Sequence, residues 1–270
     1  MMRWFFLCVC VIVSTMATAQ LSRCSGARAI GVGDCVAVMD GPGSFSDNPA
    51  AIASLSNTCA FLTAGNNFLC SELNSLFAAF SMPVKTTNLG AFFTYSGSKY
   101  FHVSSTGLSL TKVFHKKISA GLRLKYFNIH QNPENPNLHI GSFDFGVTAI
   151  LSPALSWGGY IYNPLMLKSE SSNSSTLPYG LCSGIRVRTG AYTTWLLEVE
   201  KESGRKLNLK SGIECVFGQL FTLRSGIQTA TRSLAIGCGI KLTNSYIDIS
   251  CTSNQYAGES FQLSFYHTGK

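Results

Sequence analysis

The chain has 270 residues and contains 25 glycines, with 13% of its residues charged and 11% aromatic. Soluble proteins are charged at about a quarter of their positions, so this composition argues against an ordinary soluble protein and suits a barrel whose outer wall faces lipid. The formal net charge of +8 is spread through the chain without a basic cluster or an aromatic platform, so no nucleic-acid partner is expected.

Residues 1–19 have the features of a secretory signal peptide. Arg3 precedes an apolar run from Trp4 to Val13, and Ala17-Thr18-Ala19 fits the small-x-small pattern before a cleavage site. We therefore expect export and cleavage near Ala19. Beyond this segment no run of 18 apolar residues remains, so any membrane-spanning part would consist of strands.

The segment 20–56 is rich in Gly and Ala and is expected to pack as a plug inside a barrel. Asp40-Gly41-Pro42-Gly43 predicts a turn. Asn48 is suited to cap a short helix, and Pro49 is favoured at the first position of that helix. Gly31-Val32-Gly33 lacks both the third Gly and the preceding strand of a dinucleotide fingerprint, so it predicts no nucleotide site.

From residue 57 to residue 270 the chain alternates between apolar and polar residues over short segments, which predicts an all-β fold. We expect a transmembrane antiparallel β-barrel of about 14 strands, because each segment has about the 9 to 11 residues that cross a bilayer at a tilt. A soluble β-sandwich also alternates, but its outward face needs more charge than this chain has. The expected strands are 58–66, 73–82, 87–96, 100–113, 117–128, 142–150, 154–163, 179–188, 191–200, 207–217, 219–229, 233–242, 244–252 and 260–267.

The two faces of the later strands differ in polarity. In the segment 233–242, Leu234, Ile236 and Ile240 share one face, which suits lipid, while the opposite face is small and polar. Around Gly107 the apolar parity shifts, which predicts a bulge. The assigned faces place twelve charged side chains in the lumen: Arg123, Lys125, Asp144, Arg186, Arg188, Glu198, Glu200, Lys210, Glu214, Arg224, Lys241 and Asp248.

These lumen charges have two interpretations. They form either a polar conduit or a network of ion pairs that fills the lumen and anchors the plug. Buried charges must be paired to be tolerated, so we favour the network.

Eight cysteines remain after the signal segment, and export permits disulfides. Cys215, Cys238 and Cys251 fall on the lipid-facing side, where they act as small apolar residues. The candidates for disulfide bonds are Cys24, Cys35, Cys59 and Cys70. The histidines are dispersed, and there is neither a CxxC pair nor a GxSxG motif, so we expect no metal, no cofactor and no enzymatic activity.

About thirty residues near the N-terminus resemble the plug of the FadL family of outer-membrane barrels and its PorV relatives in type IX secretion. The resemblance lies in Gly26-Ala27-Arg28-Ala29, Gly31-Val32-Gly33 and Asn48-Pro49-Ala50-Ala51-Ile52-Ala53. It implies a fourteen-stranded barrel in the bacterial outer membrane, plugged by its N-terminal segment. The plug motif consists of Gly26, Ala27, Arg28, Gly31, Gly33, Asn48, Pro49 and Ala50.

The resemblance implies two functions that differ in class. FadL proteins pass hydrophobic molecules through an opening in the barrel wall, whereas PorV proteins engage secreted cargo and the type IX translocon. Because the chain leaves little length for large external loops, the first hypothesis is a scaffold whose partners are outer-membrane lipid and proteins of a secretion complex. The alternative is passive transport of a hydrophobic small molecule, which requires an apolar path and a strand kink beside the plug.

Overall fold

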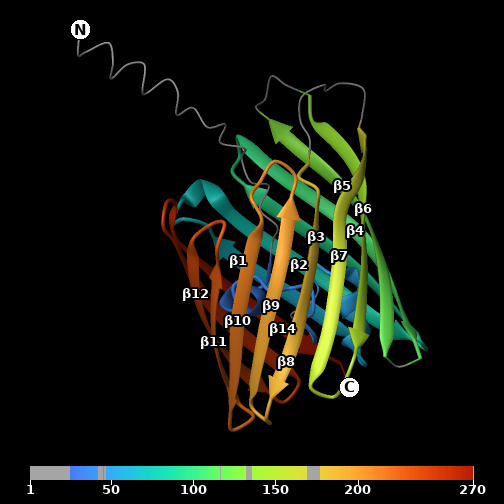
Figure 1. Ribbon diagram of the computed structural model, residues 1–270. Helices are drawn as coiled ribbons and strands as arrows, with labels where there is room; N and C mark the ends of the chain where they lie inside the picture. The colour runs from blue at the N-terminus through green and yellow to red at the C-terminus, as the bar shows by residue number, and fades with distance from the viewer. Residues whose placement is uncertain are drawn as a thin grey trace.

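Fourteen antiparallel strands close into a barrel in the computed structural model, which describes residues 25–41, 45, 47–115, 117–131, 136–168 and 177–269. Each strand pairs with its neighbours in sequence, and β14 pairs with β1 (Figure 1). The predicted fold class is thus confirmed, while the predicted signal peptide lies outside the described residues. The strands are β1 (Cys59–Asn66), β2 (Asn74–Val84), β3 (Thr87–Gly97), β4 (Phe101–Phe114), β5 (Ile118–Gln131), β6 (Leu138–Ile150), β7 (Leu155–Lys168), β8 (Gly180–Thr189), β9 (Thr193–Glu202), β10 (Asn208–Phe217), β11 (Phe221–Gln228), β12 (Ser233–Leu242), β13 (Ser245–Asn254) and β14 (Gly258–Thr268).

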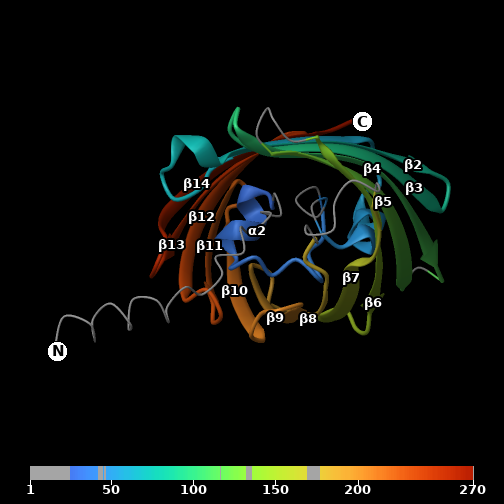
Figure 2. The same ribbon diagram turned by 90° about the horizontal axis from the view of Figure 1, so that it is seen from above.

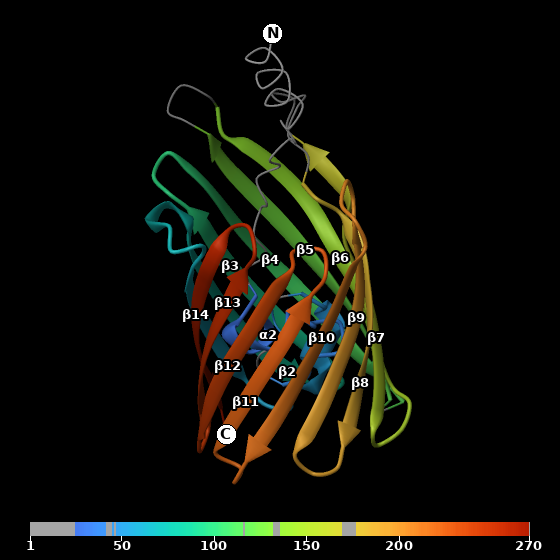
Figure 3. The same cartoon turned by 60° about the vertical axis from the view of Figure 1, so that its left-hand side comes forward.

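The outer wall of the barrel is apolar. In β12, Leu234, Ile236 and Ile240 are exposed, while Ser233 and Ala235 are buried. Figure 3 shows the same wall in its tilted strands, with β11 to β14 in front of the plug. Such a surface is stable against hydrocarbon and unfavourable against water. None of the helices within the described residues is long and apolar enough to cross a membrane.

The two ends of the barrel differ in the length of their connections. One end, here called the turn end, has connections of two to four residues, and the C-terminus lies there (Figure 1). The other, the loop end, carries four connections of five to eleven residues beside three short ones. The connections of the loop end are residues 67–73, 98–100, 132–137, 169–179, 203–207, 229–232 and 255–257.

The plug lies inside the barrel, as Figure 2 shows in the view from above. It contains a five-residue α-helix, α2 (Ala27–Gly31), and a 3-10 helix, η2 (Pro49–Ser54). Asn48 caps η2 by accepting a hydrogen bond from the Ala50 N–H at 2.9 Å, as predicted. Of the predicted turn, Gly41 has φ +72°, which fits a turn, whereas Pro42 and Gly43 lie outside the described residues.

The bulge predicted near Gly107 is wrong, because β4 pairs without interruption with both β3 and β5 there. Val103 is apolar but faces the lumen, so the alternation of apolar and polar residues only looks as if it changes phase along this strand. The register instead shifts between β6 and β7, where Ser142 pairs with Met166 but Asp144 pairs with Tyr162. In addition, β6 begins four residues earlier than predicted, and β7 ends five residues later than predicted.

Candidate functional site

Small residues bring the plug into contact with the barrel wall. A Cβ placed on Gly31 would lie 3.2 Å from the Cα of Gly237, and one placed on Gly226 would overlap the backbone of Gly33. Gly33 itself has φ +71°, which a side chain would strain. These glycines therefore allow the backbone of the plug to lie directly against the backbone of the wall.

Hydrogen bonds fix both helices of the plug to the wall. The Ala27 N–H donates to Ser264 Oγ at 2.7 Å, next to Gly26, where a Cβ would meet the ring of Phe61. Thr111 Oγ1 donates to the Pro49 carbonyl at 2.6 Å. Asn48 Nδ2 donates to the Ala37 carbonyl at 2.6 Å and so joins two parts of the plug. Ala50 has no exposed surface.

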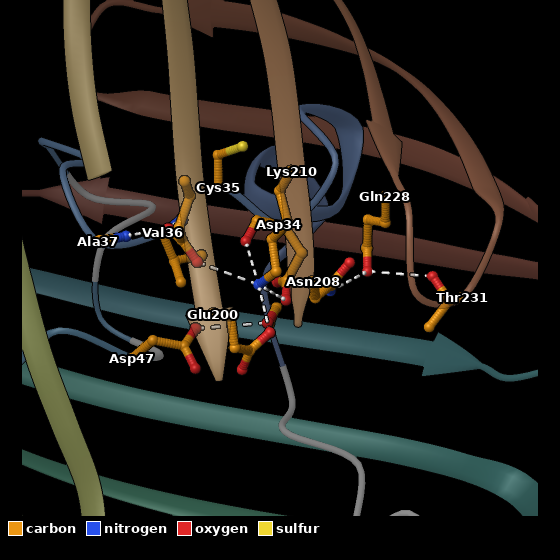
Figure 4. Close-up of polar contacts among 12 residues, drawn as sticks. Asp34, Cys35, Val36, Ala37, Asp47, Glu200, Asn208, Lys210, Gln228 and Thr231 are labelled. Atoms are coloured by element: carbon orange, nitrogen blue, oxygen red, sulfur yellow. Dashed lines mark hydrogen bonds and ion pairs between the residues drawn. The ribbon is translucent and has the colours of Figure 1, made fainter. Parts of the chain in front are cut away.

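Lys210 is the centre of one buried ionic cluster (Figure 4). Its ammonium lies 3.1 Å from Glu198, 3.0 Å from Glu200 and 3.1 Å from Asp34 of the plug. The Glu198 carboxylate also accepts hydrogen bonds from the backbone N–H groups of Val36 and Ala37, both at 2.7 Å. One cation of the wall thus holds three carboxylates and, through them, the plug.

Arg28 of the plug bridges a second cluster. Its guanidinium lies 2.9 Å from Glu214 and 3.5 Å from Asp40. Arg224 continues the chain of charges from Glu214 at 2.7 Å to Asp248 at 2.6 Å.

Asp40 in turn pairs with two further arginines of β8. Arg188 lies 3.0 Å from its carboxylate, and Arg186 also forms an ion pair with it. Burial alone would raise the pKa of the Asp40 carboxyl, but Arg28, Arg186 and Arg188 outweigh burial and hold the pKa below its ordinary value.

A third cluster lies on β5 and β6. Lys125 is 2.5 Å from Asp144, and Arg123 is 3.9 Å from it. Arg123 also donates to the plug carbonyls of Phe45 at 2.6 Å and Asp47 at 3.2 Å. Lys241 departs from the predicted network: it is exposed at the end of β12, with its ammonium 5.7 Å from the centroid of the Tyr246 ring.

The cysteine predictions have mixed outcomes. Cys35, Cys59 and Cys70 are free thiols, so the predicted disulfides are not formed by these three, and Cys24 lies outside the described residues. Cys59 begins β1 and Cys70 follows the other end of that strand, which keeps the two sulfurs far apart. Cys238 is exposed on the outer wall, as predicted.

An apolar cavity of about 440 Å³ lies between the plug and the loop end. The third cluster, formed by Arg123, Lys125 and Asp144, makes up its charged floor. Its walls are mainly aromatic and aliphatic. They include Phe77, Phe92, Phe101, Val103, Phe127, Tyr160, Tyr162 and Leu177.

Sequence reasoning missed this apolar side of the lumen. The inward positions of β8 to β13 carry most of the charges, whereas those of β2 to β7 carry many of the aromatic side chains. The sequence feature that could have revealed it is the poor alternation of apolar and polar residues in 74–80 and 100–113. Val103 belongs to a buried apolar cluster with Ile129 and Ile140, which occupy lumen-facing positions of the next two strands.

The cavity reaches a discontinuity in the barrel wall. The ladder between β7 and β8 ends at Tyr162 and Gly180. Beyond it, within the described part of the chain, residues 163–165 of β7 pair with neither neighbour, and residues 166–168 pair with β6 alone. Asn163 has φ +50° and donates to the Pro178 carbonyl at 2.8 Å across this point. Tyr162, Asn163 and Pro178 all line the cavity. Outside the same region Leu165 and Leu167 are strongly exposed.

No family model and no curated protein matches the sequence. Among solved structures, the chain is similar to the CymD monoaromatic hydrocarbon channel, with 11% identity, a TM-score of 0.69 and coverage of 91% of this chain and 97% of the channel. It is also similar to the toluene transporter TodX of Pseudomonas putida, with 8% identity, a TM-score of 0.66 and coverage of 89% and 96%. A Pseudomonas aeruginosa FadL homologue aligns with 10% identity, a TM-score of 0.62 and coverage of 90% and 98%.

These likenesses establish a shared fold. The resemblance to FadL barrels that the plug motif indicated is therefore confirmed at the level of fold. None of the three structures is described as a PorV protein or as a component of type IX secretion.

Proposed function

We propose that the protein is an outer-membrane barrel through which uncharged apolar small molecules enter the cell by passive diffusion. The observation that carries the proposal is the junction of the apolar cavity with the discontinuity between β7 and β8. The apolar outer wall supports a place in the outer membrane. The titles of the FadL-type channels with a similar fold add support to the same function.

The wall provides a better exit than the barrel axis. Along the axis the plug is held by three ionic clusters and by close backbone contacts, so a molecule passing there would have to break buried ion pairs. At the bulge of β7 the cavity is bounded by Asn163, Leu177 and Pro178. An apolar molecule leaving between β7 and β8 would pass from an apolar cavity to lipid.

The charges around the cavity favour uncharged substrates. Its lining contains four acidic residues and two basic ones, Arg123 and Lys125. Lys125 is paired with Asp144, and Arg123 donates to two plug carbonyls. A substrate carboxylate would meet an excess of negative charge here, and would lose its hydration without gaining a partner.

The secretion scaffold that the sequence first suggested has no support in these comparisons. A scaffold requires only a sealed lumen. Transport requires an apolar path and a strand kink beside the plug. The positive φ of Asn163 within the bulge of β7 supports such a kink. The Asn163 N–H donates to Asp144 at 3.2 Å, and Asp144 pairs with Arg123, which contacts the plug.

The matched pair naphthalene and naphthoate tests the proposal. Cells that lack their own channels for apolar solutes would express the full chain, and initial uptake of each radiolabelled compound would be measured. We expect faster uptake of naphthalene and unchanged uptake of naphthoate. Unchanged naphthalene uptake with a correctly folded barrel in the outer membrane would refute the proposed transport.

A deletion of Pro164 and Leu165 tests the exit. Two residues fewer would restore one continuous register between β6 and β7, because three residues, 163–165, now stand opposite the single residue Phe143. We expect this variant to fold and to lose naphthalene uptake. The point variant Leu165→Ala keeps the bulge and should retain uptake; equal activity in both variants would exclude this exit.

A further inference from the structure

A second cavity lies at the mouth of the barrel, at the loop end, and has a volume of about 230 Å³. Most of the residues that line it are polar or charged, among them Asn208, Gln228, Thr231, Asn254 and Gln262. The polar and the apolar cavity share four lining residues: Phe68, Leu73, Ser96 and Glu202. These four side chains lie where the two cavities meet, so a molecule that moves from the mouth into the apolar cavity passes along them.

Phe68 occupies this boundary in an unfavourable backbone conformation. Phe68 has φ +58° and Leu69 has φ +54°, a region that residues with a Cβ rarely adopt in succession. Hydrogen bonds hold the turn: the Phe68 N–H donates to Ser260 Oγ at 3.0 Å, and the Asn67 N–H donates to the Leu73 carbonyl at 3.2 Å. Persistent strain of this kind indicates that the position of a side chain matters.

The two strained residues have different surroundings. Leu69 is 65% exposed and lines neither cavity, whereas Phe68 lines both. Glycine would form the same turn without strain, but it would remove the ring from the boundary. The turn thus places the Phe68 ring where the polar mouth and the apolar cavity meet.

We propose that Phe68 is a specificity-determining residue that sets the upper size limit of molecules reaching the apolar cavity. This inference rests on the proposed function and adds to it a single selective position. A small flat hydrocarbon passes beside the ring with little rearrangement, while a larger one must displace it. The ring therefore acts on the rate of access and has little effect on the affinity of the cavity.

Measured rates and affinities of probe binding distinguish an effect on access from an effect on the affinity of the cavity. The purified full chain, kept soluble with an amphipathic polymer, would be mixed rapidly with naphthalene or pyrene, and probe fluorescence would give association rates and affinities. We expect Phe68→Ala to speed pyrene association by at least about tenfold, a barrier lower by about 1.4 kcal/mol, and naphthalene association by less than about threefold. The affinities should stay close to those of the wild type.

Three variants serve as controls. Leu69→Ala changes the same turn outside both cavities and should leave both rates unchanged. Phe127→Ala, in the wall of the apolar cavity, should weaken affinity for both probes without selectively speeding pyrene. Phe68→Gly relieves the backbone strain, so it should fold at least as well as the wild type and should speed pyrene as Phe68→Ala does.

The outcomes separate the two proposals. If the wild type binds both probes but Phe68→Ala and Phe68→Gly leave pyrene association unchanged, the role of Phe68 is refuted and transport stands. If the folded wild type binds neither probe, the apolar cavity does not accept such molecules. That result would overturn the proposed function and this inference together.

Discussion

At the scale of single residues, Lys210 is the side chain on which the buried charges most depend. Its replacement by Met would remove the ammonium with which Glu198, Glu200 and Asp34 all form ion pairs. We expect a loss of about 3–5 kcal/mol in the free energy of unfolding, measured by denaturant titration in detergent. Lys241→Met, at an exposed position of β12, two strands away, should change it by less than about 0.5 kcal/mol. Equal losses of unfolding free energy in the two variants would show that the ion pairs of Lys210 do not stabilise the barrel.

Gly226 tests the packing of the plug against the wall. An added Cβ at this position would overlap the backbone of Val32 and Gly33. We expect Gly226→Ala to cost about 1–3 kcal/mol and to make the plug more accessible to protease. In Gly141→Ala the added Cβ would lie 3.7 Å from the Leu167 Cβ, an ordinary contact, so this variant should behave as the wild type. Resistance of the plug to protease in both variants would show that it is seated elsewhere.

Residue patterns could predict the faces of the strands but not the partners of the charges. Alternation correctly placed Lys210 and Asp248 in the lumen, because the side-chain period of a strand is two. The pairing of Arg28 with Glu214 joins residues 186 positions apart, and it depends on how the plug threads the barrel. A local sequence pattern therefore does not show which charge of the plug meets which charge of the wall.

At the scale of elements, the segment after α2 is held at Asp40 by a pH-dependent contact. The folded-state pKa of Asp40 is lowered, so its stabilising effect is fully present above the unfolded value of about 3.9 and is lost as the pH falls through the lower folded value. We expect Asp40→Asn to lower the melting temperature at pH 6, and the difference from the wild type to shrink steadily as the pH falls below about 3.9. A difference that is constant from pH 6 to pH 2.5 would exclude this titration.

The elements that sequence analysis missed have local causes. α2 has five residues and no side-chain cap, so it depends on wall contacts such as that between Ala27 and Ser264. The strand expected at 154–163 stops just before Pro164, and proline lacks the N–H that a ladder needs. Pro164 instead lies within the bulge, where β7 has no partner residue in β8 and no such donor is required.

At the scale of the whole molecule, the lumen has two sides that differ in their chemistry. The charged side, along β8 to β13, binds the plug and closes the axis. The aromatic side, along β2 to β7, contains the apolar cavity and ends at the bulge. Under the proposed function, a barrel built in this way would stay closed to ions while it admits apolar molecules, because the two kinds of solute would not share an exit.

This separation predicts opposite responses to a loosened plug. Arg28→Met removes the ion pairs with Glu214 and Asp40, so the plug should open transiently along the axis. We expect the ion conductance of this variant in planar bilayers to rise several-fold, while naphthalene uptake by cells stays within about twofold of the wild type, since apolar molecules leave through the wall. If conductance and naphthalene uptake rise together, both solutes use the axis, and the gap between β7 and β8 is not the exit.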